Sequence, residues 1–242
     1  MEVLTAFVRE NARVSPGRVA EWHKLGGGKT PPGMSRKRPE GRVPTDIQAA
    51  LTVLMRRLTT ADRGEPLVVD LNNTDLRHAT LNDADFQAVH LSGSDLENAW
   101  FPGANLRDAY LEGANLRDAV LSGADLRDTH LDTAILVDAG LVGANLVGAH
   151  LIQAHLERAQ LWGAHLEGTD ISHAHLDHAV FYEAHLEGTC FYGTSLRETS
   201  FHLAHLACAD LRGVDLSQVK DLTREQLNEA ITDETTLLPD YL

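Results

Sequence analysis

The feature that most constrains this chain is a five-residue period. Residues 103–131 read GANLRDAYLEGANLRDAVLSGADLRDTHL. Leucines five apart advance by about 140° around an α-helix and form no apolar stripe, so a helix is excluded. In an extended chain, positions i−2 and i share a face, but because five is odd the next such pair would lie on the opposite face. Ala and Leu face inward in every repeat only if the chain bends once per repeat.

The repeat runs over residues 69–218 in 30 copies, with no unit skipped and no loop inserted. Position i is Leu in 24 copies, Phe in five and Ile in one. Position i−2 is always small, with Ala in 20 copies and Thr, Val or Ser in the others. Such units bury their apolar residues only by stacking on their neighbours. The sequence therefore predicts an all-β solenoid with an interior of Leu, Phe and Ala.

The pattern Ala-(Asp/Asn)-Leu-x-x, as at residues 104–106, 114–116 and 124–126, resembles the pentapeptide-repeat family. This resemblance implies a right-handed quadrilateral (four-sided) β-helix with four repeats per coil, in which positions i−2 and i face inward. The period alone would also allow three or five repeats per coil. With four, residues 20 apart lie one above the other, and a ladder spacing of about 4.8 Å gives a rod about 36 Å long.

Charge divides the chain into three regions. Residues 1–68 carry a net charge of +5, residues 69–218 carry −15, and residues 219–242 carry −4. We predict that the first region is helical, with a flexible basic Gly/Pro-rich linker at residues 25–44. The second region is the predicted β-helix, and the third is a capping helix with a tail.

Two amphipathic helices are predicted before the repeats, one near the start of the chain and one at residues 45–57, with Thr45 as its N-cap. Their apolar residues recur at helical spacing: Val3, Leu4, Phe7 and Val8 in the first, and Ile47, Ala50, Leu51 and Leu54 in the second. An open β-ladder exposes unpaired N–H and C=O groups. We therefore expect the second helix to cover the first coil.

A short capping helix is also predicted after the last repeat. Thr223 and Gln226 have the spacing of a capping box and precede the apolar residues Leu227 and Ile231. A helix at this place would close the other end of the ladder.

The sequence GGGKT at residues 26–30 invites comparison with a phosphate-binding P-loop. That motif needs a glycine where this chain has His23, and the following Pro31 and Pro32 oppose the helix whose N-terminus would hold the phosphate. We therefore interpret the segment as linker and expect no cofactor.

Twelve histidines lie in the repeats. With four repeats per coil, His165, His185 and His205 form an outward ladder at position i−1, and His155 and His175 stack on another face. Imidazoles at such spacing suit a transition metal, but we expect no Cys or carboxylate to complete a site. The prediction is stacked surface histidines without a metal. No nucleophile–base pair stands out and a filled solenoid offers no deep pocket, so we expect no catalytic residues and no enzymatic activity.

Two functions compete. The first is a non-catalytic protein-interaction scaffold. The second, implied by the resemblance, is a DNA mimic that modulates a type II topoisomerase (DNA gyrase) and is related to quinolone resistance. Fifteen net charges over about 36 Å amount to one per about 2.4 Å, against one per about 1.7 Å for duplex DNA. The candidate partners are an unidentified protein, DNA gyrase and a second copy of the chain; direct binding of DNA by the acidic rod is not expected.

The outward residues point to one contact surface. The face through Leu81, Leu121 and Leu161 carries just two acids, Asp83 and Glu183, in 21 outward positions. We call it the low-charge face. Aromatic residues on a flat apolar surface are common anchors of interfaces. The predicted contact residues are Trp100, Val120, Val142, Trp162, Val180, Tyr182 and Leu203.

The location is predicted from cysteine usage and hydropathy. The two cysteines, Cys190 and Cys208, occupy different repeat positions, which fits a reducing cytoplasm. The chain has no run of 18 apolar residues and no signal-peptide core. Because the first 68 residues also resemble a stretch that follows a membrane-spanning region in many actinobacterial pentapeptide-repeat proteins, membrane association is expected only if a segment precedes Met1.

Overall fold

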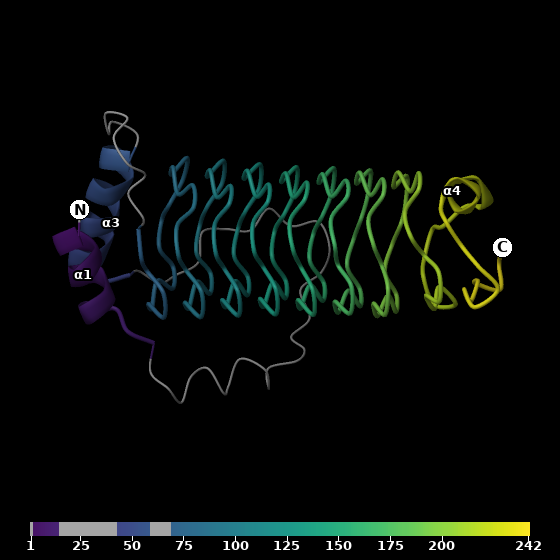
Figure 1. Ribbon diagram of the computed structural model, residues 1–242, viewed down its shortest axis with the longest axis horizontal. Helices are drawn as coiled ribbons and strands as arrows, with labels where there is room; N and C mark the ends of the chain where they lie inside the picture. The colour runs from purple at the N-terminus through teal and green to yellow at the C-terminus, as the bar shows by residue number, and fades with distance from the viewer. Residues whose placement is uncertain (1, 15–42, 59–68) are drawn as a thin grey trace.

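The structure, a computed structural model, describes residues 2–14, 43–58 and 69–242 (Figure 1). In this part of the chain the helices are α1 (Glu2–Asn11), α3 (Thr45–Leu58) and α4 (Arg224–Glu229). Between α3 and α4 the chain winds into a stack of coils along the long axis of the molecule. The predicted linker, including GGGKT and all but its last two residues, lies outside the described residues.

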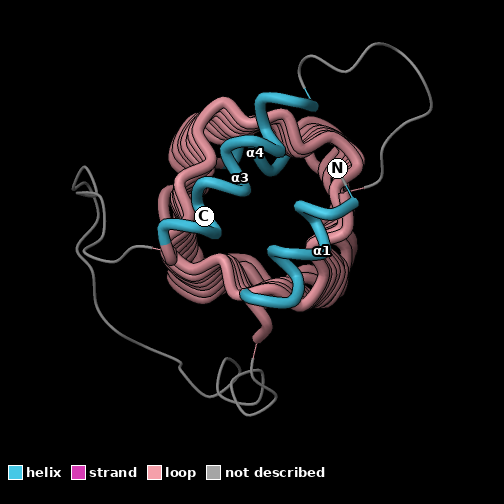
Figure 2. The backbone as a smooth tube through the Cα atoms, turned by 90° about the vertical axis from the view of Figure 1, so that its left-hand side faces the viewer, coloured by secondary structure: helices cyan, strands magenta, loops and turns pink. Residues whose placement is uncertain are grey.

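Each coil takes 20 residues, which is four repeats. Residues at position i−1 pair in parallel with the residue 20 positions later, as Asp70 pairs with His90. Leu71 N donates to His90 O over 2.7 Å, and His90 N donates to Val69 O over 2.9 Å. This register recurs along the rod and confirms the predicted stacking of residues i and i+20. The fold is a right-handed quadrilateral β-helix, seen end-on in Figure 2.

The bend in each repeat is a β-turn. Ala79 N donates to Leu76 O over 3.0 Å, and equivalent bonds close the other corners. Every residue at position i+2 from Asn73 to Gly213 has a positive φ, between 51° and 70°. Gly, Asn and Asp adopt this left-handed conformation most readily, which explains why they recur there. The turn supplies the bend that an odd period requires.

The interior is built from positions i−2 and i, which are buried along the whole rod. Large side chains stack from coil to coil, as Phe181 does on Phe201 with ring centroids 5.5 Å apart. Where Thr replaces Ala at i−2, its hydroxyl has a backbone partner; Thr129 Oγ1 donates to Leu106 O over 2.9 Å. The small polar residue therefore enters the core without an unpaired hydroxyl.

The N-terminal end of the coils is covered by α1 and α3 (Figures 1 and 2). The side-chain amide of Gln48 on α3 donates to Thr80 O and accepts from Thr80 N, both over 2.9 Å. Gln48 thereby makes the two hydrogen bonds with the Thr80 backbone that a residue of a preceding coil would otherwise make. Val8 of α1 and Leu51 of α3 are fully buried in the core. The second helix therefore covers the first coil, as predicted.

Residues 12–14 add a closure that the sequence did not predict. Arg13 forms an antiparallel bridge with Thr74, and Val14 N donates to Asn73 O over 3.1 Å. Two details of the predicted helices are wrong. Thr45 is the first residue of α3 instead of its N-cap, because Pro44 O accepts the hydrogen bond from Gln48 N. Val3, predicted in the apolar stripe of the first helix, is 81% exposed.

At the C-terminal end the predicted capping box is confirmed: Thr223 Oγ1 accepts from Gln226 N, and the Gln226 side chain accepts from Thr223 N. The Gln226 amide also donates to Phe201 O over 2.8 Å. The helix does not close the ladder alone. Ile231 bridges Asp210 and Leu237 bridges Asp215, so the tail after α4 supplies the last strand.

Candidate functional site

The low-charge face exposes several apolar side chains. Val142 is 42% exposed, Trp162 37% and Leu203 54%. Trp100, Val120, Val180 and Tyr182 are half-buried. Trp100, Val120 and Val180 belong to the column at position i−1, in which each residue pairs with the residue 20 positions later in the next coil. The predicted contact residues therefore share one side of the rod, and three of them have exposed side chains.

Aromatic rings follow one another along this face. Trp162 is tilted by 57° against Tyr182 with ring centroids 5.9 Å apart, and Tyr182 stacks on His202 at 5.5 Å. Hydrogen bonding to Glu183, followed by the charge of that carboxylate, raises the pKa of Tyr182. Beside the rings, a Cβ added at Gly143 or at Gly163 would meet nothing within 4 Å. The surface at Gly143 and Gly163 is thus open and leaves room for an approaching protein surface.

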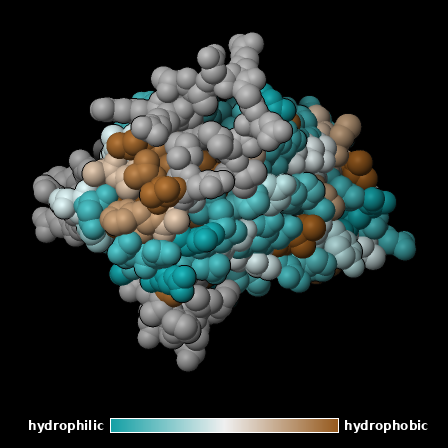
Figure 3. All heavy atoms as spheres, turned by 60° about the vertical axis from the view of Figure 1, so that its left-hand side comes forward, coloured by the Kyte–Doolittle hydropathy of each residue, from teal (hydrophilic) through white to brown (hydrophobic). Residues whose placement is uncertain are grey.

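The described helices do not lie along this face. α1 and α3 sit at the end of the coils, and the contact of α3 with the face is the pair of bonds between Gln48 and Thr80. Figure 3 shows hydrophobic residues gathered over the N-terminal end, whereas the visible flank of the coils is mostly hydrophilic. The exposed apolar residues at that end include Val3 and Phe7 of α1 and Val53 of α3.

On the other three faces many acids are paired within the rod. Arg127 contacts Asp125 at 2.5 Å and Arg158 contacts Asp138 at 2.6 Å. The hydrogen bond from Arg127 lowers the pKa of Asp125, and the hydrogen bond from Arg212 lowers that of Asp210. These pairs join neighbouring positions of one repeat or of adjacent coils. They place positive charge directly beside individual acids and weaken the field close to those acids.

The predicted histidine columns are present. His165 stacks on His185 with ring centroids 4.5 Å apart, and His185 stacks on His205 at 4.8 Å. His155 stacks on His175 at 4.7 Å. Rings at position i−1 are held in register because their backbones pair in the ladder.

One expectation about these columns is wrong. Carboxylates do lie beside the ladder: Glu167 Oε1 is 3.1 Å from His165 Nδ1, and Glu187 Oε1 is 3.6 Å from His185 Nδ1. In each case the glutamate at position i+1 reaches back to the histidine at i−1 of its own repeat. The triplet His-Leu-Glu, repeated in the sequence, is the signal that would have revealed the contact.

Two further features were missed. His90, Tyr110, His130 and His150 form a fourth aromatic column, with neighbouring centroids 4.7, 4.9 and 5.1 Å apart. Glu157, beside His155 at 3.2 Å, is largely shielded. Burial acts to raise the pKa of Glu157, but the hydrogen bonds and charges around it, chiefly from His155, outweigh burial and lower it.

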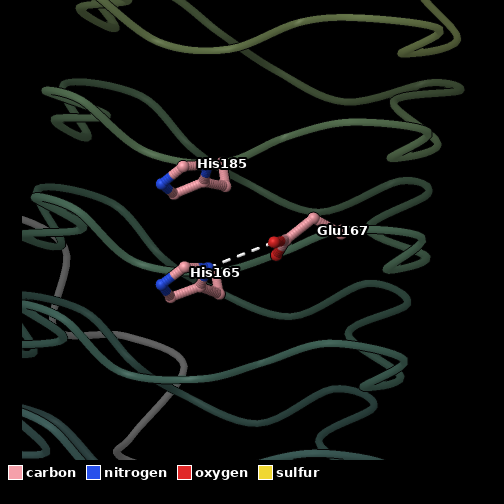
Figure 4. Close-up of side chains that lie close together, drawn as sticks. All are labelled: His165, Glu167 and His185. Carbon is pink, nitrogen blue, oxygen red and sulfur yellow. Dashed lines mark hydrogen bonds and ion pairs between the residues drawn. The ribbon is translucent and has the colours of Figure 1, made fainter.

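The described residues contain one group of three side chains with metal-ligand chemistry at close range: His165, Glu167 and His185 (Figure 4). Their ligand atoms all lie within 4.8 Å of one another. Cys190 and Cys208 are both free thiols. Within the part of the chain that the structure describes, no helix is long and apolar enough to span a bilayer.

A family model described as pentapeptide repeats (8 copies) matches residues 70–108, 101–136, 134–172, 144–181, 163–197 and 179–218. None of the curated proteins matches it.

Several solved structures are similar. HetL, a pentapeptide repeat protein involved in heterocyst differentiation regulation from the cyanobacterium Nostoc sp. strain PCC 7120, is 25% identical; the match covers 77% of this chain and 96% of HetL, with a TM-score of 0.32. A trypsin-treated variant of QnrB1, a plasmid-mediated fluoroquinolone resistance protein, is 17% identical over 72% of this chain and 91% of QnrB1, with a TM-score of 0.31. Rfr23 from the cyanobacterium Cyanothece 51142 is 28% identical over 51% of this chain and 63% of Rfr23, with a TM-score of 0.20.

Proposed function

This chain belongs to the pentapeptide-repeat family, and from that premise we propose that it is a non-catalytic protein-interaction scaffold that contacts its partner through the low-charge face. The observation that carries the proposal is the exposure of Val142, Trp162 and Leu203 on a face with two acidic residues in an otherwise acidic rod. An apolar strip of this kind gains free energy when a partner removes it from water.

The aromatic stack supports a contact with another protein. Trp162, Tyr182 and His202 follow one another along the rod, so they present a row of rings on a rigid backbone ladder. Rigid aromatic side chains lose little conformational entropy on binding and are enriched among the residues that dominate binding energy. The partner we expect therefore offers a matching apolar surface without strong charge.

A double substitution, Val142→Glu with Trp162→Glu, tests this surface. Both residues face outward, so the fold should be retained while two charges enter the apolar strip. A matched control, Val147→Glu with Ile152→Glu, adds the same charges on the other faces, where acids are common. We expect the first variant to lose proteins captured from a lysate by the parent, or to lose a parent dimer in size-exclusion chromatography, and the control to keep them.

If the Val142/Trp162 variant keeps the same partners, the same oligomeric state and the same melting temperature as the parent, the low-charge face is neither an interface nor a docking surface. Loss of partners in both variants would assign binding to the overall charge of the rod. A shift from dimer to monomer in the first variant alone would identify the partner as a second copy of the chain.

A second candidate function rests on the other three faces, which hold 20 of the 22 acids of the repeats. This distribution favours DNA mimicry, with DNA gyrase as the partner, related to quinolone resistance. The internal Arg–Asp pairs weaken the comparison with duplex DNA, whose phosphates have no such partners. A gyrase supercoiling assay at rising protein concentration separates the two functions: inhibition supports mimicry, and unchanged activity leaves the scaffold.

We further propose a cytoplasmic location, because both cysteines are free and a reducing compartment keeps thiols in that state.

A further inference from the structure

The ladder places two imidazoles and a carboxylate together on the face through Phe86, away from the low-charge face. His165 and His185 pair in the ladder, and their rings are parallel within 2° with centroids 4.5 Å apart. Glu167 extends from the next turn toward His165, with Oε1 3.1 Å from Nδ1 (Figure 4). Backbone pairing therefore fixes the origin of all three side chains before any ligand binds.

The carboxylate of Glu167 has an unused oxygen. Its Oε2 atom is shielded from solvent and makes no hydrogen bond to any described residue. A carboxylate oxygen that is withdrawn from water without a partner is costly, and each such atom in a native structure calls for an explanation. A cation bound beside Glu167 would supply the missing interaction.

From these observations we propose that His165, Glu167 and His185 bind one divalent transition-metal ion of the Zn²⁺, Co²⁺ or Ni²⁺ type. Two imidazole nitrogens with one carboxylate oxygen suit these ions, whereas Ca²⁺ and Mg²⁺ prefer ligand sets made of oxygen. Three protein ligands leave a coordination position for water or for a ligand from another molecule.

Binding requires a small movement of side chains. Metal–ligand bonds of about 2.0–2.2 Å bring ligand atoms to within about 3.5 Å of one another, closer than the present limit of 4.8 Å. The side chains of His165, Glu167 and His185 are 43%, 36% and 36% exposed, so rotation of the rings and of the carboxylate is not blocked by packing. The backbone ladder does not need to move.

The neighbouring columns provide internal comparisons. His130 stacks on His150 at 5.1 Å, but the nearby Asp132 carboxylate accepts a hydrogen bond from Ile152 N, and this pair belongs to no group of three close ligand atoms among the described residues. That pair therefore lacks a third ligand. Stacking alone is common to both columns, so a difference between them in metal binding reports on Glu167 and not on the presence of two histidines.

The test is calorimetric titration of the full chain with Zn²⁺, together with Co²⁺ absorption spectra as a signature of coordination. His155→Ala is included in every protein, so that the stacked pair of His155 and His175, with Glu157 beside His155, does not bind Zn²⁺ in parallel. In this background we compare His185→Ala, Glu167→Gln and the control His150→Ala. We expect the first two to weaken Zn²⁺ binding about tenfold or more and to lose the Co²⁺ spectrum, because each removes one of three ligands.

The control should keep both signals. Absence of Zn²⁺ binding at micromolar concentration in the background protein would overturn the proposal, as would equal affinity in all variants or equal loss in the His150→Ala control. Circular dichroism checks folding. Glu167→Gln keeps the shape of the side chain and is the decisive variant if His185→Ala disturbs the stack.

Discussion

The coils before and after residue 149 have the same interior and carry different chemistry outside. One outward column shows the change directly: it reads Asp85, Asn105, Asp125 and Asn145 in the first half, and His165, His185 and His205 in the second. The parallel pairing continues across residue 149 from one half into the other. The ladder needs Ala and Leu inside, and it accepts carboxylates, amides or imidazoles outside.

On the face through Phe86, the two halves stabilise the column at position i−1 by different interactions. In the first half, acids pair with arginines and amides: Arg127 contacts Asp125 at 2.5 Å, and Asn105 donates to Asp85 over 2.7 Å. In the second half, imidazole rings stack and glutamates approach them. Residues 69–148 have a net charge of −9 with three histidines, and residues 149–218 have −6 with nine. The interior and the exterior of this fold are therefore subject to separate physical constraints.

The largest expected effect comes from the shared interior. Leu141 is fully buried near the boundary of the two halves, while the next residue, Val142, is 42% exposed. Leu141→Lys would bury an unpaired charge and should cost several kcal/mol, on the order of 3–5. Val142→Lys should change stability by less than about 0.5 kcal/mol. Denaturant unfolding of the two variants measures the contrast, and equal stabilities would show that the inward assignment is wrong.

The next effect separates the halves by pH. Histidines gain charge between about pH 7.5 and pH 5.5. Full protonation would take residues 149–218 from −6 to +3 and residues 69–148 only from −9 to −6. The second half should then bind a cation exchanger. Two triple His→Gln variants test this by retention at both pH values: His155, His165 and His185 in one, and His78, His90 and His130 in the other.

Retention at low pH should fall strongly in the second-half triple, because its histidines make the net charge of that half positive. It should fall slightly in the first-half triple, because residues 69–148 stay net negative with or without those charges. Equal losses would show that retention follows the net charge of the whole molecule and not the charge of the second half.

The smallest effect concerns the ion pairs of the first half. Arg127 lowers the pKa of Asp125, so this pair stabilises the fold above the unfolded pKa of about 3.9, and the contribution is lost as pH falls through the lower folded value. Asp125→Asn should lower the melting temperature by less than about 3 °C at pH 6, because exposed pairs contribute little. The difference from the parent should shrink toward pH 3. A difference that stays constant with pH would assign the effect to packing.

The sequence predicted the fold through its interior. Ala at position i−2 and Leu at position i identified the residues that face inward. The number of four repeats per coil came from the family resemblance, because the five-residue period alone would also allow three or five. The hydrogen bonds of the Gln48 amide with the first coil were not predicted, because they depend on how α3 is positioned relative to Thr80. Ile231 and Leu237 continue the ladder without the five-residue period, so no pattern marked them.

The site was predicted less completely. Stacking of His165, His185 and His205 followed from the 20-residue coil, since it is a property of the backbone. The approach of Glu167 to His165 depends on side-chain torsions across a turn, which the period does not specify. The Arg127–Asp125 pair was missed for the same reason.

Hydroxyl-radical footprinting of the full chain tests whether the low-charge face is the contact surface. Trp162 and Tyr182 report on that face, whereas Tyr110, 38% exposed, and Tyr192, 61% exposed, report on the face through Leu71. In cell extract compared with buffer, we predict slower oxidation of Trp162 and Tyr182 and unchanged rates at Tyr110 and Tyr192. Unchanged oxidation of Trp162 and Tyr182, or protection of Tyr110 and Tyr192 instead, would contradict the claim.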